Sequence, residues 1–205
     1  MNFLRLISEF EQRKSRTMAS VGQYWLDRLV EKQQAALDDR IVLTGKIVAI
    51  LRNPELEREL VIPGLNIVTN DGDVYYAQSS VAETPTDDFD AAGAGFRLGT
   101  DNTAPTKSDT DVTTEDSAGR KATDATYPRT DDPDGDNTGA GVDIVTWRVS
   151  YTTAEANITG IQEGAIVDDR ATPTAALTHF LFAASFDKTA SDTLKVFVNH
   201  EMLGV

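Results

Sequence analysis

The stretch that decides the fold is Val145-Thr146-Trp147-Arg148-Val149-Ser150-Tyr151, in which apolar and polar side chains alternate strictly. Successive side chains of a β-strand point to opposite faces, so a period of two puts the apolar residues on one face and the polar residues on the other. One buried face and one hydrated face are typical of an antiparallel sheet. This stretch therefore predicts an amphipathic β-strand.

Further strand signals lie on both sides of this stretch. Strands are predicted at residues 41–51, 60–62, 95–99, 119–127, 158–167, 177–186 and 194–198. A turn at Pro63-Gly64 is expected to end the second of them, and a short helix to end near Val81. Many short strands, with no helix between the last four, indicate a mainly β fold, either an antiparallel β-sandwich or a jelly roll.

The first forty residues show a different pattern, because apolar side chains such as Trp25 and Leu29 recur there at helical spacing. We therefore predict a helical segment at residues 1–40 that anchors the protein or joins subunits. A β-sandwich domain is expected at residues 41–205. Within it, residues 83–141 are rich in Thr, Asp, Gly and Pro, which predicts a long acidic loop region.

The chain is strongly acidic, with 33 acids against 19 bases in 205 residues, a formal charge of −14 and a pI near 4.4. This charge argues against a nucleic-acid partner, which needs clustered Lys and Arg. No stretch approaches the roughly 20 apolar residues that insertion into a membrane requires. Residues 61–205 hold 24 acids, 19 of them Asp, against nine bases. We take this as a sign of a halophilic source; the alternative is an ordinary acidic surface kept soluble by its charge.

Catalytic chemistry finds little support in the sequence. The chain has no cysteine and only two histidines, His179 and His200, and it lacks the Gly-x-Ser-x-Gly turn of many hydrolases. Both histidines lie in predicted strands, where we expect them to be packed. A zinc site cannot be assembled from them. We therefore expect no enzyme and no cofactor.

One acidic turn suggests a metal site. Asp132, Asp134 and Asp136 fall at positions 1, 3 and 5 of a calcium-binding loop, and Asp143 falls at position 12. Asn137 stands where such a loop needs glycine, however, and Asp143 is shorter than the usual glutamate. The turn is thus either a calcium site or a solvated acidic turn.

Four short motifs carry a resemblance to a known group of proteins. They are Gly64-Leu65-Asn66-Ile67-Val68-Thr69-Asn70-Asp71-Gly72, Leu98-Gly99-Thr100-Asp101-Asn102-Thr103-Ala104-Pro105 with Asp109-Thr110, Ile161-Gln162-Glu163-Gly164, and Leu181-Phe182-Ala183-Ala184-Ser185-Phe186-Asp187-Lys188. Residues 40–205 resemble small structural proteins of tailed (caudoviral) phages and haloarchaeal viruses, of the head-decoration, turret or tail-fibre type. The helical first forty residues do not match that pattern.

This resemblance implies an all-β, homo-oligomeric virion protein that binds other virion proteins on the capsid or tail. It implies no catalytic or ligand residues. The sequence thus predicts a capsid decoration, turret or spike protein located in the virion. One alternative is a tail-fibre, baseplate or adhesin component, and another is a free calcium- or carbohydrate-binding module. A host surface glycan could stack on Tyr75, Tyr76, Tyr127, Trp147 and Tyr151, although packing of these rings in the core is the favoured interpretation.

Overall fold

The computed structural model describes residues 44–130 and 144–201, which form nine β-strands and one α-helix. The strands are β1 (Thr44–Asn53), β2 (Arg58–Val68), β3 (Gly95–Gly99), β4 (Glu115–Lys121), β5 (Arg129–Thr130), β6 (Ile144–Tyr151), β7 (Ile161–Val167), β8 (Ala176–Phe186) and β9 (Thr193–Glu201), and the helix is α2 (Asn70–Ser80). The prediction of a mainly β chain is confirmed for these residues. The predicted helical segment at residues 1–40 lies outside them.

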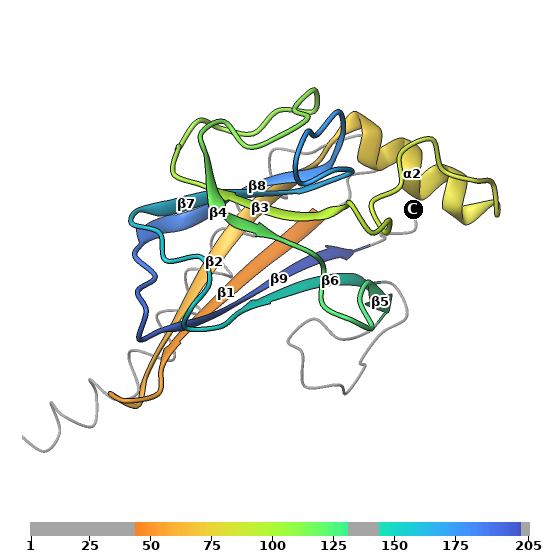
Figure 1. Ribbon diagram of the computed structural model, residues 1–205. Helices are drawn as coiled ribbons and strands as arrows, with labels where there is room; N and C mark the ends of the chain where they lie inside the picture. Colours follow the sequence, from red (N-terminus) through yellow and green to blue (C-terminus); the bar gives the residue numbers. More distant parts are fainter. Residues whose placement is uncertain (1–43, 131–143, 202–205) are drawn as a thin grey trace, which may run out of the picture. The chain divides into compact units, whose positions relative to one another are not determined.

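All nine strands belong to one antiparallel sheet, in the order β4-β3-β7-β8-β2-β1-β9-β6-β5. The sheet is strongly curled, so that β3, β4 and β7 lie opposite β9 and β6 (Figure 1). Its two ends meet: the Tyr151 hydroxyl of β6 donates to the Gly119 carbonyl of β4 over 2.8 Å, and the Asp124 amide donates to the Arg148 carbonyl over 2.8 Å. The curl therefore encloses one interior.

That interior holds the apolar core. The strictly alternating stretch places Trp147, Val149 and Tyr151 inside with at most 2 % of their surface exposed, as the period of two predicts. Residues of β9 and β8 complete the same cluster, among them Val196 and Phe180. Large buried aromatic and branched side chains supply most of the hydrophobic free energy of such a core.

The first hairpin follows the sequence only in part. Strands β1 and β2 pair from Thr44 with Ile67 to Asn53 with Arg58, so the chain turns between residues 53 and 58. We expected β2 to end before Pro63-Gly64, but it continues to Val68. The reason is tertiary: a Cβ at Gly64 would stand 2.5 Å from the Leu181 carbonyl oxygen of β8. This glycine lets β8 approach β2 instead of turning the chain.

The predicted division into a sandwich or jelly roll is not confirmed, because the strands do not separate into two sheets. Strand β2 is eleven residues long and pairs with β1 along its whole length and with β8 from Gly64 to Val68. It thereby joins strands that would otherwise form two layers. A pattern of short strands cannot reveal such a shared strand, because the pairing of β2 with β8 links residues more than a hundred positions apart.

Of the remaining predicted elements, the helix and one strand are confirmed and one strand is shifted. The short helix is confirmed as α2, which begins after the N-cap Thr69, whose hydroxyl accepts from the Gly72 amide. Strand β3 is confirmed at residues 95–99. The strand expected at 119–127 is shifted to Glu115–Lys121. In residues 44–130 and 144–201, no helix has the length and apolar character needed to span a bilayer.

Candidate functional site

Three ionisable side chains form a buried row between the sheet and the loop at residues 100–114. The imidazole of His179, on β8, is 2.7 Å from Asp109 Oδ2 through Nδ1 and 3.0 Å from Glu163 Oε2 through Nε2. His179 and Glu163 expose 1 % and 0 % of their surface, whereas the side chain of Asp109 is 26 % exposed. One histidine thus bridges a carboxylate of β7 and a carboxylate of the loop.

Glu163 is held by the loop backbone as well as by the histidine. Its two carboxylate oxygens accept from the amides of Thr113 (2.8 Å), Thr114 (2.7 Å) and Asp101 (3.3 Å). Space for this carboxylate comes from Gly99 on β3, because a Cβ there would stand 2.4 Å from Glu163 Oε1. A buried carboxylate is tolerated only when its oxygens are bonded in this way.

The electrostatics favour the charged forms of all three groups. Burial alone would lower the pKa of His179, but the hydrogen bonds and charges of Glu163 and Asp109 outweigh it and raise that pKa. Burial alone would raise the pKa of Glu163, yet the bonds from His179 and the loop amides lower it. Burial would also raise the pKa of Asp109, but the hydrogen bonds from Thr106 and His179 outweigh it and lower that pKa. These shifts favour an imidazolium between two carboxylates.

A second ionic group lies beside this row. Arg97 of β3, 4 % exposed, pairs with Asp111 at 2.6 Å and with Glu115, and its Nε donates to Glu115 Oε1 over 2.9 Å. Arg120 also bonds Glu115, and these two arginines hold the pKa of Glu115 at about 2. By contrast, burial raises the pKa of Asp111. This group attaches the end of the loop to β3.

Both clusters act on the same segment. In the His179 row, each ring nitrogen already faces a carboxylate, so neither is free to accept a proton from a nucleophile. What the arrangement provides is attachment: β3, β7 and β8 each supply a buried charged residue that holds the loop at residues 100–114. The geometry supports a rigidly presented loop.

The other histidine lies in a separate buried chain of hydrogen bonds. Trp147 Nε1 donates to the Tyr76 hydroxyl over 3.0 Å, and that hydroxyl is 2.5 Å from His200 Nδ1. Burial lowers the pKa of His200 to about 3, so its ring is neutral near pH 7. We assign the hydroxyl as the donor to Nδ1, which places the ring proton on Nε2. Nε2 has no partner among the residues that the structure describes.

This chain gives a direct stability prediction. In Tyr76→Phe, the buried Trp147 N–H and His200 Nδ1 both lose their partner, and we expect a loss of about 1–3 kcal/mol of unfolding free energy. Urea denaturation of both proteins measures it. Tyr75→Phe is the matched control: that hydroxyl makes no hydrogen bond within the described residues, so a change below about 0.5 kcal/mol is expected. Equal losses in the two variants would contradict the assigned chain.

The residues singled out from the sequence fall in three places. The calcium candidates Asp132, Asp134, Asp136 and Asp143 lie outside the described residues. In the described part of the chain, no three His, Asp or Glu side chains are arranged so that they could hold a metal ion. Both histidines are packed, as expected. Trp147, Tyr151 and Tyr127 are buried, and Tyr75 and Tyr76 pack against the core, so the interpretation of these rings as core residues is confirmed.

Comparison with known proteins gives no relative for this site. No family model matches the chain, and neither a curated protein nor a solved structure matches it. The site therefore rests on its own geometry.

Sequence reasoning missed Asp109 and Glu163 as partners of His179. A signal was present, because Glu163 and His179 are each the one ionisable residue in a mostly apolar strand. Two ionisable residues in buried strands need partners, and opposite charges satisfy each other. Asp109 carried no comparable signal, since it is one of many aspartates in an acidic loop.

Proposed function

We propose that the chain is a structural protein of a tailed-virus particle, attached to the capsid as a decoration, turret or spike protein and acting by oligomeric binding. The observation that carries this proposal is an apolar strand edge on the β1–β2 hairpin that no other strand of residues 44–130 and 144–201 pairs with. The four resembling motifs give it a second, independent support. We also propose that the curled sheet works as a sandwich, with β4-β3-β7-β8 and β2-β1-β9-β6 as its layers.

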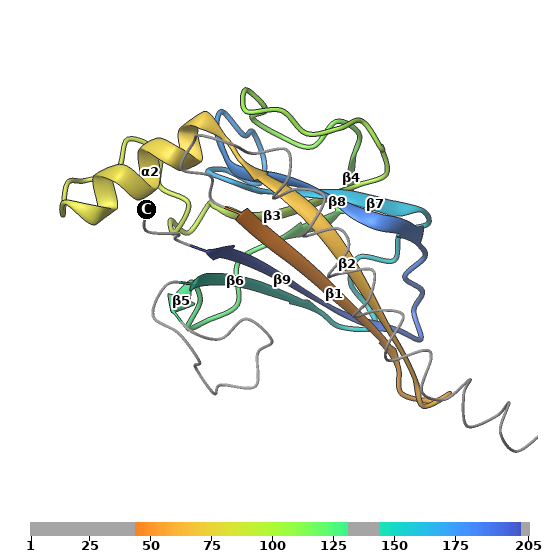
Figure 2. The ribbon, with the colours of Figure 1, turned by 180° about the vertical axis from the view of Figure 1, so that it is seen from behind.

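The strand edge lies in the first half of β2. Residues 58–63 pair with β1, whereas β8 pairs with β2 only from Gly64 onward. Figure 2 shows the hairpin reaching past the ends of β7 and β8. A strand edge of this kind presents free backbone N–H and C=O groups, which pair readily with another chain.

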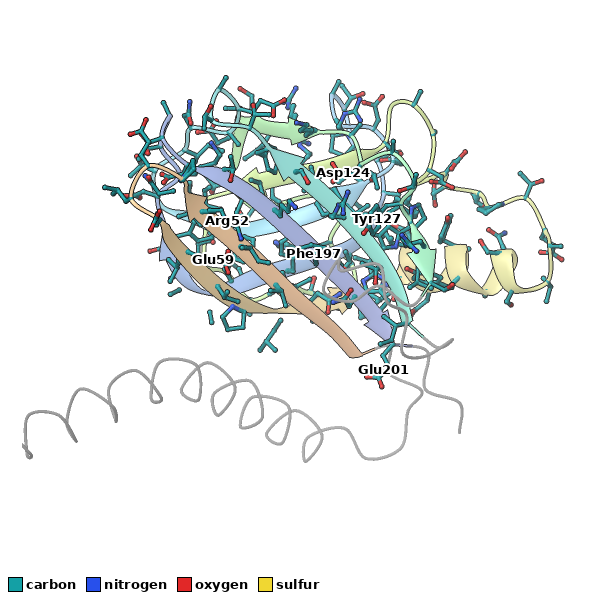
Figure 3. The ribbon with its side chains drawn as sticks, turned by 90° about the horizontal axis from the view of Figure 1, so that it is seen from below. Arg52, Glu59, Asp124, Tyr127, Phe197 and Glu201 are labelled. Atoms are coloured by element: carbon teal, nitrogen blue, oxygen red, sulfur yellow. The ribbon has the colours of Figure 1, made fainter. Side chains whose placement is uncertain are left out.

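Apolar side chains accompany this edge. Leu60 and Val61 are each 51 % exposed, and Leu56 in the hairpin loop is 61 % exposed. Arg52 and Glu59, labelled in Figure 3, form an ion pair across the two strands at 2.5 Å. Exposed apolar residues beside a free strand edge are typical of a protein–protein contact. We call residues 56–63 the hairpin edge.

Burial of the hairpin edge explains how such a protein would act. Each contact would cover a few apolar side chains and a short strand, which is modest by itself. Many copies on one particle convert modest contacts into firm attachment. The acidic surface keeps the free chains apart, and molar salt would screen that repulsion. We also propose that the protein comes from a halophilic source and that the acidic turn at Asp132, Asp134, Asp136 and Asp143 binds calcium.

The double variant Leu60→Lys, Val61→Lys tests the proposal. It adds two charges to the hairpin edge, where each side chain is half exposed, so the fold is expected to persist. We expect the self-association constant, measured by sedimentation equilibrium in molar salt, to fall by about a hundredfold or more, as when two interface residues are lost.

Val81→Lys is the control, because Val81 is 65 % exposed at the end of α2, away from the hairpin edge. It should associate like the original protein. An original protein that stays monomeric at every concentration and salt would contradict the proposal. So would a double variant that associates as strongly as the original.

A further inference from the structure

The loop at residues 100–114 contains a turn that is closed on itself. Asp109 accepts from the Thr106 amide over 2.8 Å and from the Thr106 hydroxyl over 2.5 Å. These bonds stay within the turn, so they do not attach it to the rest of the protein. We refer to residues 106–109 as the loop turn.

Within the part of the chain that the structure describes, three contacts dock the loop turn. Lys107 Nζ pairs with Asp73 of α2 at 2.5 Å, but both side chains are about half exposed. The Lys107 carbonyl accepts from the Asn70 amide over 2.8 Å. The third contact is Asp109 with His179 Nδ1, which is the only one of the three that includes a fully buried side chain. Exposed ion pairs contribute little, so much of the docking depends on His179.

The two carboxylates that face His179 are held very differently. Glu163 has no exposed surface and accepts three backbone amides besides the imidazole. Asp109 is partly exposed and belongs to a self-contained turn. A neutral imidazole would direct a lone pair at one of these carboxylates. Asp109 is the partner that can move into water.

We propose that His179 is a proton-operated latch: the imidazolium holds the loop turn on the sheet, and loss of its proton at higher pH releases the turn. Glu163 and Asp109 are the charged groups that contact His179 among the described residues. The residues paired with His179 on the neighbouring strands, Ile67 of β2 and Ala165 of β7, carry no charge. Beyond Glu163 and Asp109, the nearby acids Asp111 and Glu115 both pair with Arg97.

The pH window follows from the directions of the shifts. The pKa of His179 is raised in the folded protein, so its contribution is complete below the ordinary histidine value and is lost as the pH rises through the raised value. The pKa values of Asp109 and Glu163 are lowered, so both stay ionised throughout that range. The latch is therefore closed below the ordinary histidine pKa and opens as the pH rises through the raised pKa of His179.

Trypsin provides the test, because Lys107 lies in the loop turn. Cleavage after Lys107 is followed by mass spectrometry in the full-length protein and in His179→Gln from about pH 6 to pH 9, and the ratio of the two rates cancels the pH dependence of trypsin. We expect His179→Gln to be cut faster at the acid end. Below the pKa of His179 the ratio of the two rates should fall by up to about tenfold per pH unit, and above that pKa it should approach one.

The second histidine supplies the matched control. His200 is also fully buried but is neutral across this range, so His200→Gln should be cut like the original protein at every pH. An NMR titration of the original protein does not depend on the folding of any variant. His179 should titrate above the ordinary histidine pKa, and His200 should stay neutral across this pH range.

Two results would overturn the latch. One is a rate ratio after Lys107 that stays constant from pH 6 to pH 9. The other is an NMR titration in which neither histidine changes charge above its ordinary pKa of about 6.5.

Discussion

Replacing Glu163 with alanine should lower the free energy of unfolding by about 3–5 kcal/mol, one of the two largest effects that we expect in this chain. Glu163 is fully buried and bonds His179 and the amides of Thr113, Thr114 and Asp101. Its removal leaves a buried imidazolium without its fully buried carboxylate partner and three amides without this acceptor. Each such group then carries its full desolvation cost. Urea denaturation at constant salt measures the loss.

Glu59→Ala is the control for that variant. Glu59 also loses an ion pair, with Arg52, but both side chains are largely exposed. Exposed pairs contribute at most about 1 kcal/mol. The Glu163 variant should also lower the pKa of His179, because the strongest favourable partner is gone while burial remains. A loss no larger than that of Glu59→Ala would show that the buried row does not stabilise the fold.

Replacing Trp147 with alanine should cost about 3–5 kcal/mol for a different reason. Trp147 has no exposed surface and stands in the main core cluster, next to the ring of Tyr75. Its loss leaves a cavity that the rigid curled sheet cannot close, and it removes the donor to the Tyr76 hydroxyl. Chemical denaturation with fluorescence of the remaining aromatic residues follows the change.

Trp147→Phe separates the two contributions. Phenylalanine fills most of the space but cannot donate to Tyr76, so a smaller loss of about 1–3 kcal/mol is expected. Val81→Ala, at a position that is 65 % exposed, should change the stability by less than about 0.5 kcal/mol. If Trp147→Ala were as mild as Val81→Ala, the enclosed core described above would be wrong.

The strands were predictable where one face is buried and the other is hydrated. Strand β6 follows the period of two, and the alternate residues Ile47 and Ala49 of β1 and Leu194, Val196 and Val198 of β9 lie in the same core. The apolar residues Val48, Ile50 and Phe197 alternate with them and are not part of this core cluster. Prediction was weaker where both faces are covered: in β7, from Ile161 to Val167, six of seven residues are buried, so no alternation marks its start. Strand β4 consists mostly of charged and small residues, which give little strand signal. The strand was therefore predicted at residues 119–127, whereas it spans Glu115–Lys121.

The candidate site was less accessible to sequence reasoning. Asp109 and His179 are 70 positions apart, and only the pairing of β8 with β7 and the path of the loop bring them together. The glycine at position 64 illustrates the same point. Beside Pro63 it predicted a turn, whereas in the structure it allows β8 to approach β2. A local sequence pattern indicates which backbone conformation a residue favours, but tertiary contacts decide whether the residue turns the chain or makes room for a neighbouring strand.

By itself, the sequence determined that this chain is acidic, rich in short strands and built around an alternating stretch that ends at Tyr151. These properties follow from side-chain chemistry and from the two-residue repeat of a strand, both of which are local. Only the tertiary structure decided that the strands share one curled sheet and that His179 lies between two carboxylates. Strand order and buried ion contacts depend on residues far apart in the chain, because burial is a property of the whole packed interior.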